Sequence, residues 1–384
     1  MSNLITLPGG MILPNLHGSE GGFNQQSDVL VNQTLDGVDY NAMWAEFQDT
    51  IAIGNAERTA IVSFLSFGVT KNIEQVTQLS GAAFERASEY GEPRGIRQTP
   101  SSFNMGYDFQ WYDLAIRYTW RFLAEAESAQ VEALHAAALE ADNQLLFKLV
   151  MKSLFNPVNR TAEISGQDVN VYALYNNDGT VPPAFKSNTF DGTHSHYLAS
   201  GAATVDSGDL DAMMEHLRHH GYSKVNGLQQ VIAMNSSEGS VVTGFRIANA
   251  DKFDFIPSQA NATALILEPG QSVSGGQPAS MYKGLNVIGS YGEALIVEDD
   301  LFPVGYMTAI ATGGRDNLAN PVGIREHANT SLRGLRLVKG ADNDYPLVDS
   351  FYQRGAGTGI RHRGGSVVMQ ITVGAYAAPT LYDI

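Results

Sequence analysis

Residues 120–157 read WRFLAEAESAQVEALHAAALEADNQLLFKLVMKSLFNP, and they carry the strongest structural signal in the chain. Ala, Leu, Glu and Gln dominate the stretch, and these are among the strongest helix formers. Its apolar residues recur at spacings built from three and four, at Leu123, Val131, Leu134, Ala138, Leu145 and Leu149. Asn156-Pro157 ends the pattern. We therefore predict one helix about 50 Å long, at about 1.5 Å per residue.

The region downstream of this helix has a different character. Residues 160–384 consist of short apolar runs between glycine-rich turns, interrupted by one helix over residues 206–221. Ser207 or Asp209 would cap the start of that helix, and Gly221 lies just past its end. Helix and strand alternate without a regular βαβ rhythm, so we predict an α+β fold in which the single long helix lies across a sheet. The strand candidates are Gln230–Met234, Ala264–Leu267, Leu285–Ile288, Ala294–Val297, Met307–Ala311 and Ser366–Gly374.

Residues 69–118, upstream of the long helix, predict a long two-stranded protrusion. Two segments rich in β-branched and aromatic residues, 69–77 and 103–118, flank a polar tip with a turn signal at Gly91–Gly95. An isolated hairpin of this length is marginally stable in water. We therefore expect a neighbouring subunit to cover it.

The N-terminal part of the chain predicts an arm and two short helices. Residues 1–38 are rich in Gly, Pro, Asn and Gln, as in an extended segment that packs on something else. Asp39 can cap a helix that presents Met43, Trp44, Phe47 and Ile51. A second helix is expected from Asn55 to Phe67, ended by Gly68.

Composition excludes several classes of protein. The chain has 384 residues with 43% hydrophobic residues, enough for a sizeable core, and no cysteine for disulfides or Cys-ligated metals. The net charge of −16 argues against a dedicated nucleic-acid binder. No targeting segment or membrane span is visible. Charged residues are only 17%, against about 25% in a typical soluble protein. That low fraction is unusual for a chain that works as a monomer.

The histidines allow two interpretations. His194 and His196 lie in a loop, and His216 and His220 lie four residues apart on one helical face, which is metal-ligand spacing. Histidine also suits a helix C-terminus, where carbonyl groups are unpaired. Because no His-Glu-x-x-His occurs, we favour the second interpretation and assign no metal ligand.

The other candidate motifs do not predict a catalytic or ligand-binding site. Gly355-Ala-Gly-Thr-Gly359 is not followed by a helix, so we interpret it as a flexible loop rather than a phosphate site. The arginines of the C-terminal region predict a subunit contact or a solvated face, and they are Arg325, Arg333, Arg336, Arg361 and Arg363. No nucleophile motif is present. We assign no catalytic residue and no cofactor, and expect a protein that is not an enzyme.

The order of these parts resembles the major capsid protein of tailed bacteriophages, the Hong Kong 97-type fold. An arm, short helices, a protruding hairpin, a long helix, a mixed domain and a final strand follow in the family's order from about Asp39 onward. The segment 285–306 is similar to a late axial-domain stretch of that family, in which a strand leads to an acidic pair, here Asp299-Asp300, and then to Leu-x-Pro and Gly.

The resemblance implies four parts. They are an N-terminal arm with short helices (1–68), an extended loop (69–118), a peripheral domain with the spine helix (119–200 plus 365–384) and an axial domain (201–364). The last strand, Ser366–Ala377, would return to the peripheral domain. Mixed charges at the loop tip suit salt bridges to a neighbouring subunit. These inter-subunit contact residues are Glu85, Arg86, Glu89, Glu92, Arg94 and Arg97.

The resemblance also implies a function. Hexamers and pentamers of this chain would form an icosahedral shell around the double-stranded DNA genome of a tailed phage, assembled in the host bacterial cytoplasm and located in the virion. Portal, cement and separate scaffolding proteins are the expected partners, with no sequence-specific DNA binding and no membrane. Some relatives crosslink through a lysine on the extended loop. Since no lysine lies between Lys71 and Lys148, we expect a shell without covalent crosslinks.

Two alternatives stay open. An encapsulin-like compartment shares the fold but encloses cargo enzymes. A His-dependent metal hydrolase would use His194, His196, His216 and His220.

Overall fold

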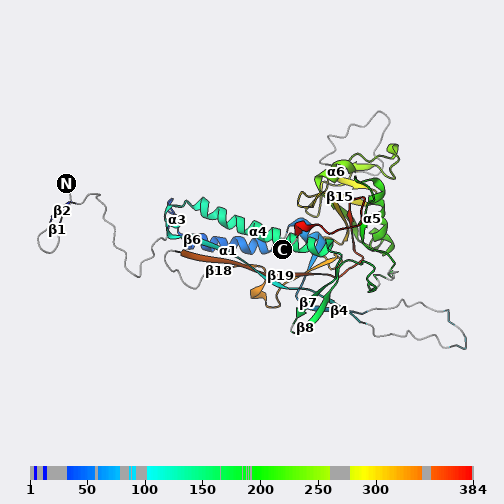
Figure 1. Ribbon diagram of the computed structural model, residues 1–384, viewed down its shortest axis with the longest axis horizontal. Helices are drawn as coiled ribbons and strands as arrows, with labels where there is room; N and C mark the ends of the chain where they lie inside the picture. Colours follow the sequence, from blue (N-terminus) through cyan, green and yellow to red (C-terminus); the bar gives the residue numbers. More distant parts are fainter. Residues whose placement is uncertain are drawn as a thin grey trace.

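The computed structural model describes most of the chain and places two groups of elements (Figure 1). An elongated group contains helices α1, α3 and α4 with strands β6, β18 and β19, and a second group is built on a larger sheet with α5 and α6. None of the helices in the described part of the chain is both long and apolar enough to cross a membrane. The described residues are 33–56, 59–77, 86–87, 89–91, 102–164, 166–183, 185–186, 188, 190, 193–259, 277–339 and 347–382, with the backbone of strands β1 (Leu4–Thr6) and β2 (Ile12–Pro14).

Helix α1 (Tyr40–Ala56) begins where the sequence predicts. The carboxylate of Asp39 accepts a hydrogen bond from the backbone N–H of Asn41 at 2.7 Å, which satisfies one of the free donors of the first turn. The helix buries Met43, Phe47 and Ile51, which are spaced four residues apart along one face. The expected cap and apolar face are both confirmed.

The second predicted helix is shorter than expected. Helix α2 (Ala60–Leu65) ends before Ser66, and the chain continues as strand β3 (Ser66–Val69). Gly68 therefore lies inside a strand and does not end a helix. Strand β3 pairs in parallel with β17 (Val322–Arg325), a partner more than 250 residues away that the local pattern could not reveal.

The long helix is interrupted once. Helix α3 (Trp120–Glu125) ends at Ala126, which is extended, and α4 (Ser128–Phe155) begins after Glu127. Glu127 and Gln130 form a capping box, so the break satisfies its own backbone donors. The carbonyl of Ala126 accepts a hydrogen bond from the N–H of Leu35 at 2.9 Å. The 28 residues of α4 give a length of about 42 Å.

A five-stranded sheet supports this helix. Strand β19 (Leu347–Ile360) pairs on one side with β18 (Leu335–Lys339) and β17, and on the other with β6 (Gln110–Thr119). The antiparallel pairing of β19 with β6 runs through ten residues, from Leu347↔Thr119 to Ala356↔Gln110. Helices α1 and α4 lie over β6, β18 and β19 in Figure 1. One long helix across a sheet is therefore confirmed.

The second sheet has seven strands in the order β11-β14-β15-β10-β16-β20-β9. Strand β10 lies in the middle of this sheet and is buried on both faces. Val231 and Ala233 belong to one apolar cluster, and Ile232 and Met234 belong to another on the opposite face. Helix α5 (Ser207–His219) covers the second face. The strands are β9 (Tyr197–Ala199), β10 (Gln229–Met234), β11 (Phe255–Pro257), β14 (Gly289–Tyr291), β15 (Ala294–Glu298), β16 (Tyr306–Thr312) and β20 (Ser366–Gln370).

The ends of α5 follow local rules. Asp206 caps the helix and forms a capping box with Asp209, so the cap is one residue earlier than Ser207. Gly221 follows the last turn with a φ of +86°, the left-handed conformation expected of glycine at that position. The predicted span of the helix and its C-terminal glycine are confirmed.

Short elements complete the described part of the chain. Of the strand candidates, 264–267 lies outside the described residues, and 285–288 is a strand only at β13 (Leu285–Asn286). The remaining elements are β4 (Ile73–Thr77), β5 (Ser102–Gly106), β7 (Arg160–Ile164), β8 (Gln167–Val171), β12 (Met281–Tyr282), α6 (Ser236–Val242) and the 3-10 turns Lys224–Asn226, Ile247–Asn249, Thr330–Leu332 and Thr380–Tyr382.

The final strands differ from the expected course. Strand β20, expected to return to the peripheral domain as part of 366–377, lies in the seven-stranded sheet between β16 and β9. The strand that runs beside α4 is instead β19, which lies within the 201–364 segment expected to form the axial domain. Both strands have pairing partners far away in the sequence, so local pattern alone does not assign them to a sheet.

A buried ion pair fastens α4 to β19. The guanidinium of Arg354 donates to both carboxylate oxygens of Asp142, and both side chains are nearly inaccessible to solvent. Arg354 also donates to the side-chain oxygen of Asn55 on α1 at 3.1 Å. Asn55 in turn exchanges hydrogen bonds with the backbone of Leu335 on β18. One polar network thus joins two helices to two strands.

We predict that Asp142→Asn lowers the free energy of unfolding by about 3–5 kcal/mol, because it leaves the buried Arg354 guanidinium without a counter-charge. Asp113→Asn on the exposed part of β6 is the matched control and should change it by less than about 0.5 kcal/mol. Urea denaturation of unassembled full-length protein measures both. Equal effects of the two substitutions would contradict the assigned role of the pair.

Candidate functional site

The base of the predicted extended loop is a short hairpin. Strands β4 and β5 pair from Ile73↔Gly106 to Thr77↔Ser102, and β6 leaves this hairpin to join the five-stranded sheet. The segment 103–118, expected as one return leg, is therefore two strands with different partners. At the tip, Arg86 and Glu89 are exposed, and Glu85, Glu92, Arg94 and Arg97 lie outside the described residues.

The glycines at 355, 357 and 359 belong to strand β19 and not to a flexible loop. They alternate, so all three lie on one face of the strand, and the hairpin base crosses that face. A β-carbon on Gly357 would lie 1.9 Å from the carbonyl oxygen of Asp108, and one on Gly359 would lie 2.5 Å from that of Gly106. Such close backbone approach is a known reason for glycine inside a strand.

Polar contacts hold the hairpin base in this position. Asp108 forms an ion pair with Arg160 at 2.6 Å and accepts a hydrogen bond from the backbone N–H of Thr358. Arg160 also donates to Ser153 at the end of α4, at 2.9 Å. The base is thereby tied to the sheet, the long helix and the hairpin of β7 and β8.

A second set of contacts lies on the other side of the base. The buried Tyr107 hydroxyl donates to Glu74 at 2.9 Å, and Arg361 forms an ion pair with Glu74 at 2.9 Å. Burial raises the pKa of Tyr107 far above its usual value, with the Glu74 carboxylate adding to the effect, so the hydroxyl stays a donor. Arg325 donates to the carbonyl of Tyr107 at 2.9 Å.

The C-terminal arginines, for which the sequence predicts a subunit contact or a solvated face, have partners within the chain. Arg363 is wholly buried, pairs with Asp178 at 2.5 Å and lies over the ring of Tyr172. Arg325 and Arg361 hold the hairpin base. Arg333 donates to the carbonyls of His327 and Ala328, and Arg336 donates to Gln353. These side chains stabilise the fold through internal partners.

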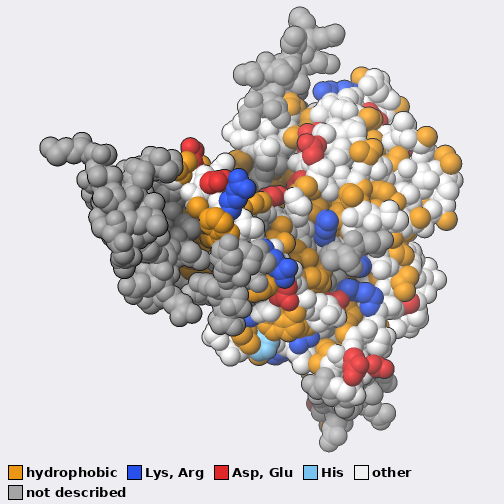
Figure 2. All heavy atoms as spheres, turned by 60° about the vertical axis from the view of Figure 1, so that its left-hand side comes forward, with side chains coloured by type: hydrophobic (Ala, Val, Ile, Leu, Met, Phe, Trp, Pro, Cys, Tyr) orange, Lys and Arg blue, Asp and Glu red, His pale blue; other side chains and the backbone are white. Residues whose placement is uncertain are grey.

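Strand β6 offers an open edge. Among the described strands it pairs only with β19, and seven of its ten residues are exposed. Trp111 is 43% exposed and Leu114 is 42% exposed, with Trp120 close behind at the start of α3. In Figure 2, which turns this end of the molecule forward, hydrophobic side chains lie among scattered charged ones. A long exposed edge with large apolar side chains is a surface for pairing with another chain.

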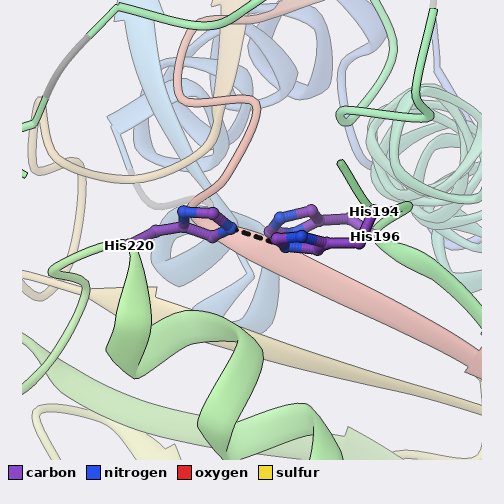
Figure 3. Close-up of side chains that lie close together, drawn as sticks. All are labelled: His194, His196 and His220. Atoms are coloured by element: carbon purple, nitrogen blue, oxygen red, sulfur yellow. Dashed lines mark hydrogen bonds between the residues drawn. The ribbon is translucent and has the colours of Figure 1, made fainter. Parts of the chain in front are cut away.

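His194 and His196, from the loop before β9, come together with His220 at the end of α5 (Figure 3). The Nε2 atoms of His194 and His220 are 2.8 Å apart, and possible ligand atoms of His194, His196 and His220 all lie within 4.8 Å of one another. The Nε2 of His219 is 3.1 Å from that of His194. His216 contacts the cluster only through its ring, and its Nδ1 donates to the carbonyl of Ala212.

His196 and His220 are buried in this cluster. Burial lowers the pKa of His196 well below its usual value, with the neighbouring histidines adding to the effect. Burial therefore favours the neutral form of this imidazole. The helix C-terminus alone does not explain this arrangement, because His194 and His196 come from the segment before β9 rather than from α5.

The fold and its surfaces define a class of structural protein. The described residues place an anchored hairpin and an open sheet edge at the surface, and the assignment of no catalytic residue remains a prediction of the sequence. These features belong to a chain that builds contacts with other chains.

Comparison with known proteins identifies the family. A solved structure from Mycobacterium phage Patience is 46% identical, with alignment over 92% of this chain and 94% of that chain and a TM-score of 0.71. The bacteriophage PhiM1 mature capsid is 10% identical over 82% and 88% at a TM-score of 0.48, and the SrpI encapsulin of Synechococcus elongatus is 10% identical over 83% and 89% at 0.45. No family model matches the chain. No curated protein matches it either.

The chain belongs to the family of bacteriophage major capsid proteins with the Hong Kong 97-type fold. It is a structural capsid protein with the α+β architecture that the sequence predicts, and its place is the multimeric capsid of a virion.

We predict that Gly357→Ala destabilises the protein by about 3 kcal/mol, since no side-chain rotation relieves a clash with the Asp108 carbonyl. Gly68→Ala is the matched control: Gly68 also lies in a strand, but its β-carbon meets nothing within 4 Å. That substitution should change the free energy of unfolding by less than about 1 kcal/mol. Thermal and urea unfolding measure both, and a neutral Gly357→Ala would show that the hairpin base does not press on β19.

Proposed function

We propose that this chain assembles as hexamers and pentamers into the icosahedral shell around the double-stranded DNA genome of a tailed bacteriophage. The observation that carries the proposal is the 46% identity to a mycobacterium phage structure over nearly the whole of both chains. Assembly in the host bacterial cytoplasm, with separate scaffolding, portal and cement proteins, is part of the proposal.

The anchored hairpin supports a role in contacts between subunits. Asp108, Tyr107 and Glu74 hold its base through ion pairs and hydrogen bonds. We propose that the firmly held base supports contact between the outer part of the loop and a neighbouring subunit. We propose that the tip docks by complementary salt bridges to the adjacent subunit, because exposed mixed charges favour register and orientation over raw affinity.

The parts of the chain then have separate roles. We propose that residues 1–68 and 69–118 make most contacts with neighbours, while α4 and the two sheets form the body of the shell. The net charge of −16 suits a shell that does not bind the anionic DNA nonspecifically during packaging.

Assembly of the full-length chain is the direct test. We expect shells or capsomer rings by negative-stain microscopy of protein expressed in bacteria. The charge-reversed variant Arg94→Glu/Arg97→Glu should raise the protein concentration needed for assembly by at least about tenfold, since each lost interaction of about 1.4 kcal/mol is a factor of ten.

The matched control for that variant is Arg94→Lys/Arg97→Lys, which keeps the charge and should assemble nearly as wild type. Circular dichroism reports whether both variants fold. A wild-type chain that stays monomeric at every concentration would refute the proposed function. Equal assembly by the charge-reversed variant would refute the role of the tip charges alone.

We propose further that the shell carries no covalent crosslinks. No lysine lies between Lys71 and Lys148, so the outer part of the extended loop has no amine for an isopeptide bond. Mature particles boiled in detergent should release monomer as one band on a denaturing gel. A ladder of covalent multimers would contradict this expectation.

A further inference from the structure

The histidine cluster lies where two separate parts of the chain meet. His194 and His196 come from the segment that leads into the edge strand β9, and His220 caps the C-terminus of α5. Figure 3 shows the two loop histidines pointing toward His220 from the opposite side. Phe190 stacks on the His220 ring with centroids 3.8 Å apart, which shields one side of the cluster from water.

The tautomer of His196 is set by its surroundings. Its Nδ1 lies 2.8 Å from the carbonyl oxygen of Ser366, and a carbonyl can only accept, so Nδ1 carries the proton. With the proton on Nδ1, the Nε2 of this imidazole is the atom that can offer a lone pair to a ligand. This Nε2 is buried and has no hydrogen-bond partner in the described structure. A buried polar nitrogen without a partner is costly and calls for an explanation.

His194 contacts two other histidines through the same nitrogen. Its Nε2 lies 2.8 Å from the Nε2 of His220 and 3.1 Å from the Nε2 of His219. A ring nitrogen has one in-plane direction, with either one proton or one lone pair. The two contacts therefore share one proton or one lone pair, and a metal ion placed between the nitrogens would be an alternative centre for them.

We propose that His194, His196 and His220 bind one Zn²⁺ ion, or a divalent transition metal of similar preference. Neutral imidazole nitrogens are favoured ligands of such ions. Metal-bound histidines commonly donate their other ring N–H to a backbone carbonyl, as His196 does to Ser366. The proposal goes beyond the capsid function and does not depend on it.

The geometry is close to what a metal needs. Two nitrogens that bind a tetrahedral Zn²⁺ at about 2.0–2.1 Å are about 3.3 Å apart. The candidate ligand atoms already lie within 4.8 Å of one another, with the shortest pair at 2.8 Å. Small rotations of exposed or half-buried rings, such as that of His194, bring the distances into range.

The bound metal would act as a structural fastener. It would join the C-terminal end of α5 to the segment before β9, and β9 forms the outer edge of the seven-stranded sheet. Within the described residues, the group that meets these distances contains three histidines and no carboxylate. Three histidines leave the fourth position of a tetrahedral Zn²⁺ ion to water. Because His196 and His220 are buried and restrict the access of a substrate, we assign the ion a structural role.

The test is metal binding by the full-length chain. Protein stripped with chelator, incubated with ZnCl₂ and desalted should retain one Zn²⁺ per chain by elemental analysis. Its melting temperature should rise by several degrees with Zn²⁺ and fall again with EDTA. Absence of retained zinc, or an unchanged melting temperature with one zinc bound, would overturn the proposal without affecting the capsid function.

Variants locate the site. His194→Gln and His220→Gln should each weaken Zn²⁺ binding by more than about 100-fold, because each removes a direct ligand. His216→Gln, on the same helix face as His220, and the distant His327→Gln should bind as wild type. Circular dichroism of the metal-free proteins separates lost binding from lost folding. Stoichiometric binding by His194→Gln, or its loss in His327→Gln, would refute the assignment.

Discussion

The structure depends on strand β19, because its 14 residues carry the backbone hydrogen bonds of three other strands. One edge pairs with β6 over ten residues, and the other pairs first with β18 and then with β17. The buried pair of Arg354 and Asp142 fastens the same strand to α4, and both charges lie in a site that excludes water. Removal of one partner of such a pair leaves an uncompensated charge in the interior, so the contact between β19 and α4 is costly to break. The long helix, the five-stranded sheet and the hairpin base therefore all contact the same strand.

The hairpin and the open edge of β6 follow from that constraint. Gly355, Gly357 and Gly359 leave one face of β19 bare, so residues 106–109 can cross it at backbone contact distance. The crossing leads from β6 to the hairpin of β4 and β5, which packs against β8, and β6 keeps one edge unpaired among the described strands. The two features suited to contacts between chains thus have a common origin in the glycine pattern of one strand.

Sequence reasoning succeeds here where structure is local and fails where it depends on distant partners. The Asp39 cap, the apolar face of α1, most of the long helix and Gly221 after α5 were all predictable, because caps and helical periodicity act within a few residues. The break at Ala126 depends in part on Leu35, and the strand after Leu65 depends on β17. The alternating glycines at 355–359 are a signal for a strand face that another segment approaches closely. The sequence does not show which segment that is. The spacing of the histidines indicated a cluster. Only the three-dimensional structure shows that its third member beside His194 and His220 is His196 and not His216.

The low charge of the chain has a physical explanation in these contacts. Only 17% of residues are charged, and several of the cations are used inside the molecule: Arg354 and Arg363 are buried, and Arg160 and Arg361 hold the hairpin base. The surface of one chain is therefore even less charged than its composition suggests, while Trp111, Leu114 and Trp120 are exposed along the open edge. Apolar groups beside unpaired strand backbone favour association with another chain. A neighbouring subunit can bury the apolar side chains and also form hydrogen bonds with the free backbone groups. An exposed edge of this kind fits a chain that belongs to a family of capsid proteins, whose members contact other copies of themselves.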